Sequence, residues 1–223
     1  MLDFLKHKTV PPHLGIRETL FGDMPMERWL DISPQALAAE PWAYFDRANR
    51  LLIAGDKLGA TDIFREILTK TNLESRFYLQ AWYFLRELGV EPPPEIAKQL
   101  FGVVVEVGMP KGLDLVCAYA DHHARYFNFS GAGVVWDRPN DQLDAAIDVL
   151  LQESRAVVKA IGSWKEKRPA APGNNEARIS FLTPSGLHFG QGPMKLLGND
   201  PMGGTVLRSA FNLMQEMIKL TKK

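Results

Sequence analysis

Two stretches of the chain contain residue types that can do chemistry. The first, "ADHHARYFNFSGAGVVWD" at 120–137, places two adjacent histidines behind an aspartate. The second, "TPSGLHFGQGP" at 183–193, combines hydroxyl groups with a histidine and glycines. Nucleophilic and acid–base catalysis use hydroxyls, imidazoles and carboxylates. The candidate catalytic residues of a hydrolase or transferase are therefore His188, Ser185, His122 and Asp121.

Both stretches also have a structural interpretation, which we favour. In a strand, His122 and His123 would point to opposite faces and would not reach one metal ion; in a turn they could, but a third ligand would still be needed. The spacing of H-E-x-x-H zinc sites is absent, and so are the G-x-S-x-G, G-x-G-x-x-G and P-loop patterns. We therefore expect two turns, with no metal site and no cofactor.

A ligand pocket is a third possibility for the same region. The aromatic residues of 119–136 would either wall a pocket or fill the interface between a sheet and its helices. Glycine backbone near 190–192 would either bring N–H groups together on a ligand oxygen or mark a bulge. The candidate ligand-binding residues are Tyr126, Trp136, Gly190 and Gly192.

Three other reactive groups give weaker indications. Glu106 and Asp114 fall on neighbouring predicted strands, where they would either meet across the sheet or lie on its solvent face. Cys117 stands in the apolar sequence "LVCAY", where a free cysteine behaves as a small hydrophobic residue.

The composition excludes several classes of protein. The chain has 223 residues, of which 46% are hydrophobic, and its 26 basic and 26 acidic residues give no net charge. Balanced charge provides no general attraction to nucleic acid or to an anionic membrane, and we expect neither as a partner. The basic runs at 165–169 and 219–223 are predicted to be solvated.

The compartment follows from cysteine content and hydropathy. One cysteine allows no intramolecular disulfide, which fits a reducing environment. The amino terminus lacks the apolar core of a signal peptide, and no run of about 18 apolar residues suggests a membrane span. We expect a soluble cytoplasmic protein.

We expect three parts along the chain. Residues 1–40 are predicted to form an arm that packs on the body, because Phe4, Phe21 and Trp29 are too apolar for a free tail. Residues 41–100 show helical spacing, including a capping-box pattern, "TNLE", at 71–74 that would open one helix. Residues 101–223 are predicted to form an α+β domain.

The helical segment locally resembles one tetratricopeptide unit. Gly55, Ala60, Phe64 and Leu68 stand where that repeat prefers a turn glycine, a small residue, an aromatic and an aliphatic residue. The resemblance covers about residues 42–69 and implies a repeat-type helical module. No second unit follows in register, and the alternative is a helical bundle packed on a sheet.

The third part alternates between strand and helix patterns. β-branched runs separated by turn residues predict an antiparallel meander over 101–137 and a last hairpin over 178–192. Apolar residues at helical spacing predict two long helices, at about 141–161 and 203–221. The fold class is therefore α+β, with an amino-terminal helical segment followed by an antiparallel sheet and two long helices.

These features favour a non-enzymatic protein-interaction or adaptor protein. The helical segment and the wide apolar surface of the last helix suggest a protein partner, and that helix would also suit a homodimer. The alternatives are a small-molecule sensor or an enzyme. A pocket joining 119–136 to 183–192 would favour either alternative, whereas filled space there would favour the adaptor.

Overall fold

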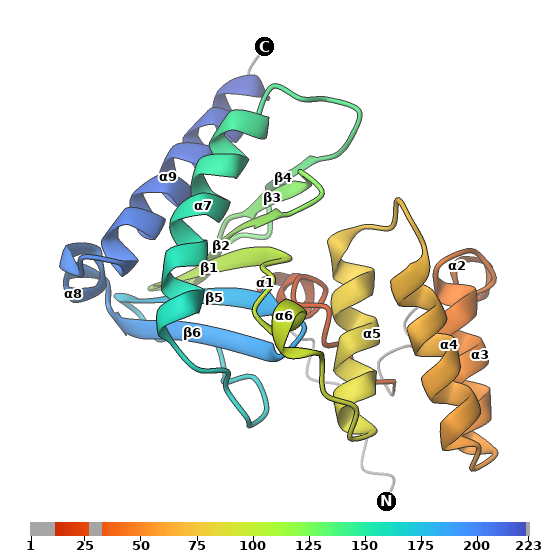
Figure 1. Ribbon diagram of the computed structural model, residues 1–223. Helices are drawn as coiled ribbons and strands as arrows, with labels where there is room; N and C mark the ends of the chain where they lie inside the picture. The colour runs from red at the N-terminus through yellow and green to blue at the C-terminus, as the bar shows by residue number, and fades with distance from the viewer. Residues whose placement is uncertain (1–11, 27–32, 222–223) are drawn as a thin grey trace, which may run out of the picture.

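The computed structural model describes residues 12–26 and 33–221 and has the predicted α+β class. Its centre is a six-stranded antiparallel sheet in the order β4-β3-β2-β1-β5-β6 (Figure 1). The strands are β1 (Gly102–Met109), β2 (Gly112–Tyr119), β3 (Ala124–Phe127), β4 (Gly133–Trp136), β5 (Glu176–Thr183) and β6 (Gly186–Pro193). The meander and the last hairpin expected from the sequence are both present.

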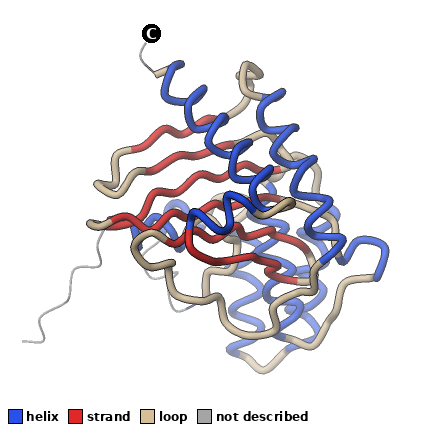
Figure 2. The backbone as a smooth tube through the Cα atoms, turned by 90° about the vertical axis from the view of Figure 1, so that its left-hand side faces the viewer, coloured by secondary structure: helices blue, strands red, loops and turns tan. Residues whose placement is uncertain are grey.

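One face of the sheet is covered by two long helices, α7 (Asp144–Ala160) and α9 (Gly203–Leu220), which lie side by side across it (Figure 2). Val103 and Val105 of β1 and Phe181 of β5 meet these helices in one buried cluster. Helix α7 begins a few residues later than the sequence suggested, and the short α8 (Met194–Asn199) was not expected.

The opposite face carries α1 (Pro12–Glu18) and part of α5 (Ser75–Glu87). Leu20, Phe21 and Leu79 pack there against Val104 and Leu115 of the sheet. The Tyr119 hydroxyl donates to the Leu20 carbonyl at 2.7 Å. Phe4 and Trp29, also expected to pack the arm, lie outside the described residues.

The helical segment contains α3 (Trp42–Ile53), α4 (Lys57–Thr69) and α5, with the short α2 (Pro34–Leu37) and α6 (Pro94–Ala97) at its ends. Gly55 has a φ of +83° in the turn between α3 and α4. Asp56 caps α4 by accepting from the Gly59 N–H at 2.8 Å. Phe45, Phe64 and Phe84 then form the centre of a second buried cluster.

Among the helices of the described ranges, none combines the length and the apolar character needed to cross a lipid bilayer.

Candidate functional site

Asp121, a candidate catalytic acid, lies in the turn between β2 and β3. Its carboxylate accepts a hydrogen bond from the backbone N–H of Ser75, the first residue of α5. The first N–H groups of a helix have no partner within the helix, so Asp121 caps α5 from outside. The capping box expected at 71–74 does not form, because α5 begins later and Glu74 instead binds Arg76 at 2.6 Å.

The two adjacent histidines lie in the turn between β2 and β3, and their side chains diverge. His122 has a φ of +63°, and its Nε2 lies 3.0 Å from the Asp148 carboxylate on α7. His123 lies with Nδ1 3.1 Å from Asp121 and with Nε2 3.8 Å from Asp137. Each histidine therefore contacts different carboxylates.

Ser185 and His188 do come together, in the hairpin formed by β5 and β6. The Ser185 hydroxyl lies 3.1 Å from His188 Nε2 and 3.0 Å from the Thr183 hydroxyl, which also donates to the Gly186 carbonyl at 2.9 Å. Two of the four candidate catalytic residues thus form a hydrogen-bonded pair.

His188 is 1% exposed, and no described residue forms a hydrogen bond with its Nδ1. Burial lowers the pKa of His188, and the charges of Lys98 and Lys165 act in the same direction. The backbone of Ile161 and Gly162 raises the pKa of His188, but by less than burial lowers it. The net result is a ring that is neutral at neutral pH, as a general base must be.

A cleft of about 490 Å³ lies beside this pair, between α5, residues 164–168 and the turn from β5 to β6. Its volume falls within the range of small-ligand sites. The walls include the aromatic residues Phe21, Tyr83 and Trp164 together with Ser185. Six charged side chains that form no ion pair with a described residue also line the cleft: Arg86, Glu87, Glu91, Lys165, Glu166 and Lys167.

Trp164 holds one wall of the cleft in place. Its backbone N–H donates to the Leu187 carbonyl at 2.6 Å, and its indole N–H donates to the Lys167 carbonyl at 3.1 Å. Its ring meets Phe189 edge to face at 5.3 Å. Trp164 nevertheless remains 39% exposed as a residue, so it offers apolar surface on a fixed support.

The four candidate ligand-binding residues lie away from the cleft. Trp136 belongs to the buried cluster beneath α7 and α9, and the partly buried Tyr126 packs against that cluster. Gly190 and Gly192 lie on β6 opposite Ile179 and Ala177. The cleft adjoins the β5–β6 turn, but no residue of 119–136 lines it.

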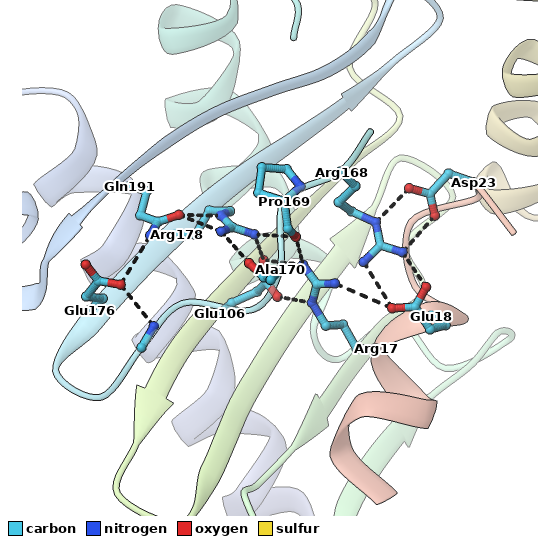
Figure 3. Close-up of polar contacts among 11 residues, drawn as sticks. Arg17, Glu18, Asp23, Glu106, Arg168, Pro169, Ala170, Glu176, Arg178 and Gln191 are labelled. Carbon is cyan, nitrogen blue, oxygen red and sulfur yellow. Dashed lines mark hydrogen bonds and ion pairs between the residues drawn. The ribbon is translucent and has the colours of Figure 1, made fainter. Parts of the chain in front are cut away.

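Figure 3 shows a network of ion pairs and hydrogen bonds that joins α1, β1, β5 and residues 168–170. Glu106 is fully buried and receives hydrogen bonds from Arg17 of α1 and from Arg178 of β5. Arg178 also binds Gln191 of β6 at 2.8 Å. The backbone carbonyl of Pro169 accepts from Arg17 at 2.9 Å and from Arg178 at 3.1 Å. Two guanidinium groups thus share one carboxylate, and burial lowers the pKa of Arg178. Backbone carbonyls and Gln191 accept their other hydrogen bonds, which indicates a structural role.

Arg168 extends this network to the edge of the cleft. It binds Glu18 at 2.8 Å and Asp23 at 2.7 Å, and its guanidinium lies 4.1 Å from the centre of the Phe21 ring. Although burial acts in the opposite direction, Asp23 and Glu18 raise the pKa of Arg168. The run at 165–169, predicted to be solvated, therefore includes a buried anchor for the amino-terminal arm.

Neither expectation for the strand carboxylates holds. Glu106 lies opposite Leu115, and Asp114 lies opposite Val107, so the two carboxylates are on different faces of the sheet. Glu106 is buried rather than solvated, while Asp114 accepts from the backbone N–H of Phe129 at 2.8 Å. Their separation follows from strand alternation once the register is known.

Two further kinds of reactive site are a cluster of metal ligands and the single thiol of the chain. No group of three histidine, cysteine or acidic residues in those ranges is arranged to hold a metal ion. Cys117 is fully buried, and burial raises the pKa of its thiol, which disfavours the reactive thiolate.

The residues that sequence reasoning missed are Arg86, Tyr83 and Trp164. They line the cleft from segments far apart in the chain, and no motif joins them. No protein-family model matches the chain, and comparisons with curated proteins and with solved structures give no significant match.

Proposed function

We propose that this protein is a non-enzymatic interaction module and that its cleft binds a short segment of a partner chain. The observation that carries the proposal is the lining of the cleft, which combines unpaired charges of both signs with exposed aromatic surface. Polypeptide segments present the same mixture of groups. Aromatic side chains on fixed supports are also common anchors in binding sites.

A cytoplasmic location agrees with this role. The single cysteine, Cys117, is a buried free thiol, so the fold depends on no intramolecular disulfide. Proteins without disulfides are typical of reducing compartments.

Affinity selection with peptide pools tests the proposal. The full chain is incubated with randomised heptapeptides, and enriched sequences are resynthesised and measured by calorimetry. Trp164→Ala is expected to weaken their binding at least tenfold, because it removes the exposed ring from the cleft. The matched control is Leu196→Ala on α8, which is 67% exposed and does not line the cleft.

Thermal unfolding of both variants checks that each remains folded at the temperature of the measurement. The proposal fails if no peptide is enriched by the wild-type chain. It also fails if the enriched peptides bind Trp164→Ala as tightly as Leu196→Ala.

A homodimer through α9 is a second interaction that we propose. Leu213 and Met217 of α9 are buried within the chain, so a dimer would use the half-buried Met214 and Ile218 beside them. Sedimentation velocity is expected to show a dimer that Ile218→Lys converts to monomer. A wild-type monomer at all concentrations would exclude this interface.

The pair formed by Ser185 and His188 supports a second candidate function, that of a serine hydrolase. A fluorophosphonate probe tests this function directly. The Ser185 oxygen would attack phosphorus, the P–F bond would break, fluoride would leave, and the hydroxyl proton would pass to His188 Nε2. A serine hydrolase predicts one added phosphonyl group, the mass of the probe less HF, in the wild type and none in Ser185→Ala.

The control for this experiment is Ser130→Ala, which removes an exposed turn serine and must retain the label. Absence of labelling in the wild type would exclude an activated Ser185. Labelling that persists in Ser185→Ala would place the reactive group elsewhere.

A further inference from the structure

Arg86 is unlike the other arginines that are not exposed in the described ranges. Arg17 and Arg178 bind Glu106, Arg76 and Arg125 bind Glu74, and Arg168 binds Glu18 and Asp23. Among these arginines, Arg86 alone has no carboxylate of a described residue within 4.0 Å.

The guanidinium of Arg86 is held in place but not saturated. One of its N–H groups donates to the Pro184 carbonyl at 2.5 Å, which is the one hydrogen bond it forms with a described residue. A Cβ atom added at Gly186 would be 3.6 Å from the Arg86 Nε. The guanidinium therefore lies next to the backbone of this glycine. Since a guanidinium carries five N–H donors, most of them are free for a ligand.

The surroundings of Arg86 favour an anion. No carboxylate of a described residue lies within ion-pair distance of this guanidinium, and burial, the main influence on the pKa of Arg86, lowers that pKa. Glu91, Asp23 and Glu87 act in the opposite direction from beyond ion-pair distance, and Asp23 is already bound to Arg168. A partly desolvated cation of this kind gains stability when a ligand supplies the missing anion.

We propose that Arg86 is the subsite of the cleft that binds a carboxylate of the partner segment, either its chain terminus or the side chain of an aspartate or glutamate. The fork of N–H groups in a guanidinium matches the two oxygens of a carboxylate. A phosphate dianion is disfavoured because four basic and four acidic side chains line the cleft, which leaves no excess of positive charge for a doubly charged group. This inference rests on the proposed function, because it names the group that the bound segment presents.

Three peptide pools distinguish the two sources of the carboxylate. The first pool of randomised heptapeptides has a free carboxyl terminus and no acidic residues. The second pool has a terminal amide and contains acidic residues. The third pool has a terminal amide and no acidic residues. The first pool is enriched if the terminus is bound, and the second is enriched if a side chain is bound. The third pool should give no enrichment.

The variants then assign the carboxylate to Arg86. Arg86→Gln is expected to weaken binding of the enriched peptides at least tenfold. Arg86→Lys keeps the charge and the contact with Pro184 but loses the fork, so it should bind between wild type and Arg86→Gln. The control is Arg155→Gln, an exposed arginine on α7 that does not line the cleft, which should bind as wild type.

The outcomes separate the two proposals. Enrichment of the third pool, or equal binding by Arg86→Gln and wild type, overturns the carboxylate subsite and leaves the interaction module standing. Absence of enrichment from all three pools overturns both. Because Arg86→Lys retains a donor for Pro184, loss of binding in this variant with an unchanged melting temperature cannot come from unfolding.

Discussion

The carboxylate of Asp121 accepts a hydrogen bond from the backbone N–H of Ser75 and so joins the β2–β3 turn to the start of α5. Near the other end of the same helix, Arg86 donates to Pro184 in the β5–β6 turn. The two stretches of sequence that looked most reactive therefore hold one helix near its two ends. This helix forms one side of the cleft.

Replacing Asp121 tests its role as a cap. Asp121→Ala is expected to lower the free energy of unfolding by about 0.5–2 kcal/mol, the usual cost of losing a helix N-cap. Asp62→Ala is the control, because Asp62 is exposed and its contact with Arg65, at 3.6 Å, is a surface pair. Urea unfolding measures both variants, and equal stability of the two would contradict the capping role.

The buried network predicts a larger effect at Glu106. Glu106→Gln leaves Arg17 and Arg178 buried with no full negative charge between them, and breaking a buried ion pair typically costs about 3–5 kcal/mol. The matched control is Glu216→Gln, which removes the exposed pair with Lys219. Denaturant unfolding should separate the variants clearly. A loss below about 1 kcal/mol in Glu106→Gln would show that this network contributes little to stability.

The sequence predicted most of the strands and long helices, because apolar spacing and turn residues are local signals. It did not predict which side chains meet. Glu106 and Arg178 are 72 positions apart, and they become neighbours only through the register of β1 with β5. The Ser185–His188 pair was within reach of sequence reasoning because a tight hairpin brings these residues together.

Local sequence patterns could not predict the cleft either, because its walls come from distant parts of the chain. Its lining residues Arg86 and Trp164 come from α5 and from the segment after α7, and only tertiary packing brings them together. The ion pairs of Arg168 could not be predicted either, because nothing in the sequence "KEKRP" indicates that this arginine binds Glu18 and Asp23.

A glycine in β1 predicts a backbone clash. A Cβ at Gly108 would overlap the carbonyl of Gly173 and approach the backbone of Pro172. Gly108→Ala is therefore expected to cost about 1–3 kcal/mol, the usual range for overpacking. Gly162→Ala is the control, since its Cβ would meet nothing within 4 Å. Chemical denaturation should give Gly108→Ala a clearly lower free energy of unfolding than Gly162→Ala. The reverse order would contradict this packing.

The buried ring of His188 predicts a dependence of stability on pH. Its pKa is lowered in the folded state, so the unfolded chain binds more protons as the pH falls below about 6.5. This residue therefore destabilises the fold progressively below that pH, by at most about 1.4 kcal/mol per pH unit, and has no such effect above it.

The variant His188→Gln isolates this contribution. Unfolding free energies of wild type and His188→Gln are measured from pH 5 to pH 8, and the difference between them should change only in the acidic part of this range. A constant difference would show that the pKa of His188 is the same in the folded and unfolded chains.

Amide hydrogen exchange of the full chain, alone and with a peptide enriched from the randomised pools, tests the central claim that the cleft is the binding site. The account predicts added protection at residues 164–168, at 182–187 and in the last turn of α5. Unchanged exchange in these three segments, with protection confined to 119–136 or to another surface, would contradict it.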